Sequence, residues 1–147
     1  MAIGLAALGL LAFLLGCSGT FAEPQNSERP VKCSLTGIWM NDHGNTIEIN
    51  SVSDTGVLSG VFFLYSTKHI YPSSLQGIQH QWTQPTFGLI VSGELDGHTF
   101  VFAGQCLVDE NGKEQLRTTW VVRSEVEFPE DVWGATRLRT SIFYRIK

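Results

Sequence analysis

Eight short segments with the polar–apolar alternation of β-strands follow one another along the chain, separated by residues that form turns. Alternation places successive side chains on opposite faces, so each segment offers one face to a core. The links SDTG at 53–56, ELDG at 94–97 and DENGKE at 109–114 favour antiparallel hairpins between neighbours. The predicted strands are 35–40, 45–52, 57–65, 74–79, 86–92, 99–106, 115–123 and 136–146.

These segments predict an all-β fold, an eight-stranded antiparallel up-and-down β-barrel. Closing the sheet removes both unpaired edges, which favours a barrel over the alternative, a two-sheet sandwich. No segment has a run of helical period, and no internal repeat is visible. The abundance of Thr, Val, Ile and Phe agrees with a β-rich chain.

The first 22 residues resemble a secretory signal peptide. Residues 2–17 are apolar but too few to span a bilayer as a helix, and the small residues up to Ala22 resemble a cleavage site. A basic residue near the start is missing, and LLGC at 14–17 leaves bacterial lipoprotein processing as an alternative. We therefore expect a signal peptide at 1–22, a flexible polar tail at 23–32 and a barrel domain at 33–147. The mature protein is expected to be secreted and extracellular, without membrane attachment.

Charge and motif content argue against several other classes of protein. The formal net charge is −4 and the ten Lys and Arg are scattered, so no nucleic-acid partner is expected. No nucleophile motif, phosphate loop or paired general acid and base is present, which predicts no enzyme and no catalytic cofactor. No metal site is expected, because the spacing typical of zinc ligands is missing from the four histidines, His43, His69, His80 and His98.

Two cysteines, Cys33 and Cys106, remain after the expected cleavage. In an oxidising compartment such an even pair favours a disulfide, which would close a loop of about 70 residues and contribute about 4 kcal/mol. The alternative is a pair of separate buried thiols.

The strand faces indicate where a ligand would bind. Residues two apart share a face, and the interior of an eight-stranded barrel can hold one small ligand. Polar residues beside wide aromatic residues are typical of a lined cavity, although aromatic residues in a barrel are equally compatible with plain core packing. The sets that share a face are Asn41, His43 and Asn45; Phe62, Leu64 and Ser66; His98, Phe100 and Phe102; Thr118, Trp120 and Val122; and Arg139, Ser141 and Phe143.

Four segments together resemble the avidin family of secreted biotin-binding proteins: CSLTGIWMNDHGN, TQPTFG, FAGQCLVDENGKEQLRTTWVVRS and WGATRLRTSIFYRI. The resemblance covers residues 33–147 with compatible spacing, and the combination is far more specific than any one segment. It implies an eight-stranded barrel assembled as a homotetramer, with one ligand site at the open end of each barrel. It also implies a disulfide between Cys33 and Cys106.

The resemblance implies roles for individual residues. Asn41 matches an Asn in the polar cluster that holds the ureido oxygen of biotin, and Trp120 matches a Trp that packs on the bicyclic ring. Trp133, in the loop before the last strand, matches a Trp that a neighbouring subunit inserts into the site. The strand faces and the resemblance together give the predicted ligand-binding set, which is Asn41, His43, Asn45, Phe62, Leu64, Ser66, Phe100, Phe102, Trp120, Val122, Trp133 and Ser141.

Several members of this set depart from the family pattern. Phe62 stands in place of a Tyr, and Asn45 in place of a Ser, that both contact the ureido oxygen. Leu64 replaces a small hydroxyl residue and Ser141 replaces an Asn or Asp, both of which serve the ureido nitrogens, while Phe100 replaces a Thr near the ligand sulfur. Each ligand polar group left unpaired in a dry site costs about 1–3 kcal/mol, so weaker binding than in avidin is expected.

The sequence therefore supports two functions of different classes. The first is a protein that sequesters biotin or a related small molecule as a secreted homotetramer. The second is an oligomerisation module that keeps the avidin fold although its pocket has decayed. A lipocalin-like carrier of an apolar ligand is a third interpretation.

Overall fold

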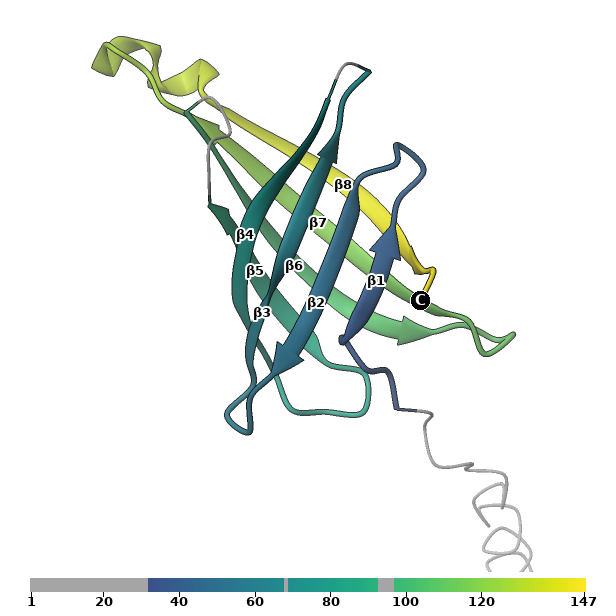
Figure 1. Ribbon diagram of the computed structural model, residues 1–147. Coiled ribbons are helices and arrows are strands. Elements are labelled where there is room, and N and C mark those ends of the chain that lie inside the picture. Colours follow the sequence, from purple (N-terminus) through teal and green to yellow (C-terminus); the bar gives the residue numbers. More distant parts are fainter. Residues whose placement is uncertain (1–31, 68, 93–96) are drawn as a thin grey trace, which may run out of the picture. The chain divides into compact units, whose positions relative to one another are not determined.

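Eight antiparallel strands close into a barrel in which each strand pairs with its neighbours in chain order (Figure 1). The computed structural model describes residues 32–67, 69–92 and 97–147, so the predicted signal peptide and all but Lys32 of the predicted tail lie outside the described residues. The strands are β1 (Gly37–Met40), β2 (Thr46–Val52), β3 (Val57–Tyr65), β4 (Ile70–Gln79), β5 (Thr86–Ser92), β6 (His98–Val108), β7 (Glu114–Ser124) and β8 (Thr136–Arg145). The predicted barrel is thus confirmed, and pairing of β1 with β8 excludes the sandwich.

Two strands, β1 and β4, start more than one residue away from their predicted positions, and the remaining limits agree within two residues. The segment before Gly37 is not part of β1, and the carbonyl of Leu35 accepts the indole N–H of Trp39 instead of a strand partner. β4 begins at Ile70, four residues before its predicted start, and runs through Pro72. Pro72 lies opposite Phe63 of β3.

One short helix was not predicted. η1 (Pro129–Gly134) is a single 3₁₀ segment between β7 and β8, with a proline in its first positions and two acidic residues in its first turn. Six residues are too few to show a helical period in the sequence.

The barrel interior is filled by apolar side chains that alternate along the strands. On β5, Phe87, Leu89 and Val91 are buried while the residues between them are exposed. This alternation follows directly from the two-residue period of a strand. The largest fully buried side chains are Trp39, Phe62, Phe102, Phe143, Leu35, Ile47, Ile49, Leu58, Leu75, Leu89, Leu116 and Val91.

Gly60 marks a close approach between β2 and β3. A Cβ atom at this position would lie 1.9 Å from the carbonyl oxygen of Glu48. The register of the two strands shifts next to this point, between Ile49 and Ser51, and a bulge of this kind increases the local bend of a strand. Only glycine fits this contact without displacing the backbone.

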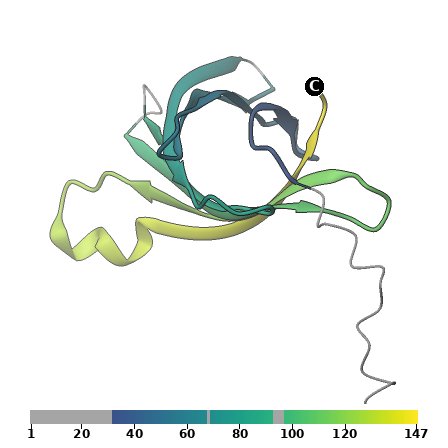
Figure 2. The same cartoon turned by 90° about the horizontal axis from the view of Figure 1, so that it is seen from below.

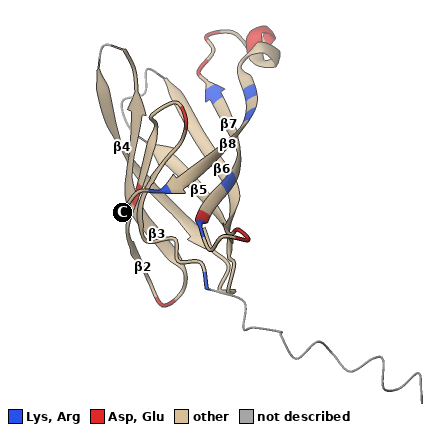
Figure 3. Ribbon diagram, turned by 90° about the vertical axis from the view of Figure 1, so that its right-hand side faces the viewer, with Lys and Arg blue, Asp and Glu red and all other residues tan. Residues whose placement is uncertain are grey.

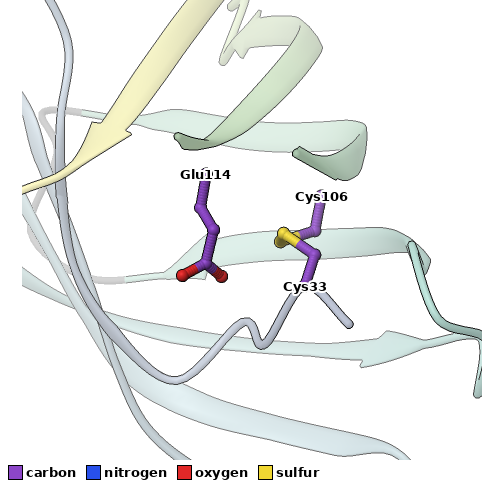
Figure 4. Close-up of side chains that lie close together, drawn as sticks. All are labelled: Cys33, Cys106 and Glu114. Carbon is purple, nitrogen blue, oxygen red and sulfur yellow. A yellow bond between two sulfur atoms is a disulfide. The ribbon is translucent and has the colours of Figure 1, made fainter. Parts of the chain in front are cut away.

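The segment before β1 is fastened to the rest of the barrel by a covalent bond. Cys33 forms a disulfide with Cys106 of β6, as the resemblance implied, and Glu114 of β7 lies beside the bridge (Figure 4). The Glu114 carboxylate accepts the backbone N–H of Ser34 at 3.2 Å and forms an ion pair with Arg145 at 2.9 Å. The sulfurs are bonded to each other, so this cluster offers no thiolate to a metal.

β7 and β8 run beyond the ring of strands and carry η1 at their far end (Figure 2). Figure 3 shows basic residues along these two strands and acidic residues on η1. The basic residues of the two strands are Arg117, Arg123, Arg137, Arg139 and Arg145, and the acidic residues of η1 are Glu130 and Asp131. In the described part of the chain, no helix has the length and apolar character needed to cross a membrane.

Candidate ligand-binding site

A small cavity lies inside the barrel, between the β1–β2 turn and the aromatic residues of β3, β6, β7 and β8. Seven residues of the predicted ligand set line it, together with Phe143 of β8, which that set did not include. The space open to the centre of a water molecule is about 10 Å³, so the cavity admits about one water. The lining residues are Asn41, Asn45, Phe62, Leu64, Phe100, Phe102, Trp120 and Phe143.

Aromatic rings form most of the cavity wall. Phe100 and Phe102 of β6 both stack on Trp120 of β7, with ring centroids 5.7 and 5.9 Å apart. Phe62 of β3 approaches the same two phenylalanines, at 5.9 and 5.6 Å. These separations are typical of favourable aromatic pairs, so the wall is a continuous packed cluster. Its faces are suited to an apolar ring.

The polar wall comes from the turn that joins β1 to β2. Asn41 is buried, and its Oδ1 accepts two backbone N–H groups, from His43 at 3.0 Å and from Asn45 at 2.9 Å. Asn45 Oδ1 accepts the backbone N–H of Tyr65, at 3.0 Å. Both side chains thus hold the local backbone with their oxygens. A backbone N–H group requires an acceptor, so the oxygen of each carboxamide must face the backbone. The NH₂ group of each side chain therefore points away from these backbone N–H groups.

A hydrogen bond to β8 holds the Trp120 side chain. Its indole N–H donates to Ser141 Oγ at 3.0 Å, and Thr118 donates its hydroxyl to the Ser141 carbonyl at 2.8 Å. These bonds connect β7 to β8 and fix the orientation of the indole ring. Thr118 is buried and faces inward, but it was not in the predicted ligand set.

The other predicted residues lie outside this cavity. His43 is exposed and, like Ser141, borders a wider cleft between the β1–β2 turn and β8. Ser66 is exposed beyond the end of β3, and Val122 packs against the core without lining the cavity. The Trp133 side chain is 95% exposed on η1, away from the cavity of its own barrel.

Comparison with known proteins assigns the family. The model of the Avidin family matches residues 29–146. The chain belongs to the avidin family. It is 41% identical to avidin from Gallus gallus over 143 residues, which is 93% of both chains. It is also 42% identical to avidin-related protein 1 from the same organism over 139 residues, covering 92% of this chain and 91% of that protein.

Solved structures of the avidin family have the same fold. A biotin-binding protein from chicken superposes with a TM-score of 0.74 at 40% identity, covering 79% of this chain and 98% of that one. Xenavidin gives a TM-score of 0.73 at 37% identity, covering 78% and 99%. Avidin-family proteins bind ligands without catalysing a reaction, so this chain is not an enzyme.

Besides Thr118, two further inward-facing residues, Phe143 and Ser73, were not in the predicted ligand set. Strand alternation had placed Phe143 on one face with Ser141, but the predicted ligand set did not include it. Ser73 of β4, opposite Phe62, is 4% exposed. Its Oγ is the one buried side-chain polar atom among the described residues that has no hydrogen-bond partner. No pattern around Ser73 in the sequence indicates this.

Proposed function

We propose that this avidin-family chain binds biotin or a related small molecule inside its barrel. The observation that carries the proposal is the meeting of the Asn41 carboxamide with the Trp120 ring at one cavity. An amide donor beside an aromatic face suits a flat ring that carries a carbonyl oxygen. The biotin-binding protein from chicken, which has the same fold, supports biotin as the first ligand to test.

Binding requires movement of the cavity wall. The free space of about 10 Å³ is far smaller than a bicyclic ring, so side chains near the mouth must rotate when the ligand enters. Leu64 and Phe100 are suited to this, because Leu64 is only partly buried and Phe100 keeps 8% of its surface exposed. The tightest non-covalent complexes have a binding free energy of about −18 kcal/mol. Moving these side chains and leaving ligand N–H groups unpaired would make the binding free energy less favourable than this by about 5–10 kcal/mol. Affinity in the nanomolar to micromolar range follows.

The cavity size also favours a second candidate function. A barrel whose own aromatic side chains fill its interior is suited to serve as an assembly module that no longer binds biotin. In that case oligomerisation would remain although the pocket is closed.

We propose self-association as a homotetramer in either case. The outer face of β3 to β6 exposes a continuous group of aliphatic side chains, Val57, Ile78, Ile90 and Val101, which are between 39% and 63% exposed. Side chains of this kind are suited to the interface between two copies of the chain. Trp133 requires a partner for the same reason, since so exposed an indole gains most by packing against another subunit.

Trp133→Lys tests whether Trp133 of η1 covers the site of a neighbouring subunit. Trp133 is 95% exposed, so the substitution should change the free energy of unfolding of the single barrel by less than about 0.5 kcal/mol. Biotin affinity should fall by at least about tenfold if a neighbouring Trp133 covers the site. Light scattering that gives a monomer mass for the unmodified protein at micromolar concentration would contradict the tetramer.

Secretion after removal of residues 1–22 remains part of the proposal, with 23–32 as a tail and 33–147 as the barrel domain. The disulfide between Cys33 and Cys106 supports an oxidising, extracellular location. N-terminal sequencing of the protein recovered from the culture medium tests the cleavage site. A retained Met1 would contradict it.

Calorimetric titration of the secreted protein with biotin tests binding directly. We expect a saturable heat with one ligand per chain, and a loss of at least about tenfold in affinity for Trp120→Ala. Trp82→Ala is the matched control, because Trp82 is 68% exposed and does not line the cavity. The absence of heat from a tetrameric, folded protein would favour the assembly module.

A further inference from the structure

The hydrogen-bonding capacity of the cavity is unevenly divided between donors and acceptors. Asn41 Oδ1 accepts two backbone N–H groups, so both of its lone pairs are used. Asn45 Oδ1 accepts one, which leaves it a single lone pair. The backbone carbonyls of Asn41 and Asn45 already accept the N–H groups of Gly44 and Asn41, each at 3.0 Å, so each keeps at most one lone pair.

The donors of the same two side chains remain available. Neither Asn41 Nδ2 nor Asn45 Nδ2 has a hydrogen-bond partner among the described residues, and each carries two N–H groups. The third polar lining group, the Trp120 indole N–H, is already bonded to Ser141 Oγ. The other lining side chains are Phe62, Leu64, Phe100, Phe102 and Phe143, which have no polar atoms.

Two nearby hydroxyl groups, those of Ser141 and Ser73, do not supply the missing acceptors. Ser141 Oγ already accepts the indole N–H and does not line the cavity, so at most one lone pair remains on it. Ser73 Oγ is unpartnered but fully buried, and it also does not line the cavity. Among the lining side chains, a ligand N–H group therefore finds one free acceptor lone pair, on Asn45 Oδ1, and otherwise aromatic and aliphatic carbon.

From this distribution we infer that the cavity selects a compact apolar ring that carries a hydrogen-bond acceptor, such as a carbonyl oxygen, with no N–H group beside it. The inference rests on the proposed function and names the ligand class for that site. A cyclic ketone, lactone or carbonate places its oxygen at the two Asn NH₂ groups and leaves nothing unpaired. A cyclic urea such as that of biotin places the same oxygen there but leaves at least one of its two N–H groups against carbon. Burying a donor without a partner carries its full desolvation cost.

The test compares biotin with its carbocyclic ketone analogue, in which CH₂ replaces each of the two ring N–H groups. The ring size and the side chain of the ligand stay the same, so calorimetric titration of the full secreted protein isolates the effect of the N–H groups. We expect the ketone to bind at least about tenfold more tightly than biotin. Equal affinity, or tighter binding of biotin, would overturn the inference and leave the proposed function intact. If neither ligand binds to the folded protein, both fail.

Asn41→Asp tests the role of the Asn41 NH₂ group in the preference for the ketone over biotin. The Asp carboxylate keeps an oxygen that can accept the N–H groups of His43 and Asn45, but it replaces the NH₂ donor by an acceptor. The ratio of ketone to biotin affinity should therefore fall by at least about tenfold in this variant. Asn50→Asp is the matched control, because Asn50 is exposed on β2 outside the cavity and should leave the ratio unchanged. A ratio unchanged in Asn41→Asp, with folding verified by thermal denaturation, would overturn the inference.

Discussion

Replacing Arg145 by Met should open the seam where the barrel closes. β1 and β8 pair over only two residue pairs, Trp39 with Arg145 and Met40 with Tyr144. The Arg145 guanidinium reinforces this short seam, since it lies over the Trp39 ring with 4.2 Å from its Cζ to the ring centroid. It also donates to the carbonyl of Thr36 at 2.7 Å and to the carbonyl of Ser34. One side chain thus joins the last strand to the segment before the first.

The contacts of the Arg145 side chain determine how much stability Arg145→Met should remove. The two-pronged bond to Glu114, at 3.0 and 2.9 Å, is partly exposed and is expected to contribute no more than about 1 kcal/mol. The bonds to the two backbone carbonyls are charge-assisted and contribute about 1.5 kcal/mol each, and the contact with Trp39 adds about 1 kcal/mol. Since these contributions are not additive, we expect Arg145→Met to lower the free energy of unfolding by about 3–4 kcal/mol. Arg145→Lys keeps the charge but loses the planar fork, so it should recover less than half of this loss.

Urea denaturation of the oxidised proteins, at one fixed protein concentration, measures these differences. Arg137→Met is the matched control, because Arg137 is an exposed arginine on the same strand and its loss should cost less than about 0.5 kcal/mol. If Arg145→Met and Arg137→Met unfold at the same urea concentration, the reasoning on the seam is wrong.

Three further sets of variants test the ligand site, the contact at Gly60 and the disulfide. Phe62→Tyr combined with Ser141→Asn should tighten biotin binding by about 10- to 1,000-fold, because each restored hydrogen bond returns about 1–2 kcal/mol. Phe63→Tyr, one residue along β3, should leave the titration unchanged, and the opposite result would show that the inward face is misassigned. Gly60→Ala should lower the free energy of unfolding by at least about 2 kcal/mol, whereas Gly88→Ala, whose Cβ would meet nothing closer than 3.9 Å, should change it by less than about 0.5 kcal/mol. Replacing both Cys33 and Cys106 by Ser removes a cross-link between positions 73 residues apart and should lower the free energy of unfolding by about 4 kcal/mol, and an unchanged urea midpoint would contradict this.

The strands were predictable because their signal is local. Two-residue alternation and turn residues identify β3 and β5 at their observed limits, Val57–Tyr65 and Thr86–Ser92. The same alternation places Phe62 and Phe102 correctly in the interior. It fails for His43 and Ser66, which lie in links beyond strand ends, where alternation no longer fixes the direction of a side chain.

The tertiary contacts were not predictable in the same way. Arg145 contacts Ser34, Thr36 and Glu114, and no pattern within one segment connects residues so far apart. The disulfide was implied by family resemblance, while cysteine counting alone left two buried thiols as an alternative. The small free volume of the cavity depends on how Phe62, Phe100 and Trp120 pack together, which no single strand determines. The ligand-binding roles of these residues remain predictions.

A crystal structure of the secreted protein grown with saturating biotin tests the central claim most directly. The account predicts the ligand ring inside the barrel against Trp120, its carbonyl oxygen within 3.2 Å of Asn41 Nδ2, and rotated side chains at Leu64 and Phe100. An interior that keeps its packed aromatic cluster, with biotin bound outside the barrel or not at all, would contradict it.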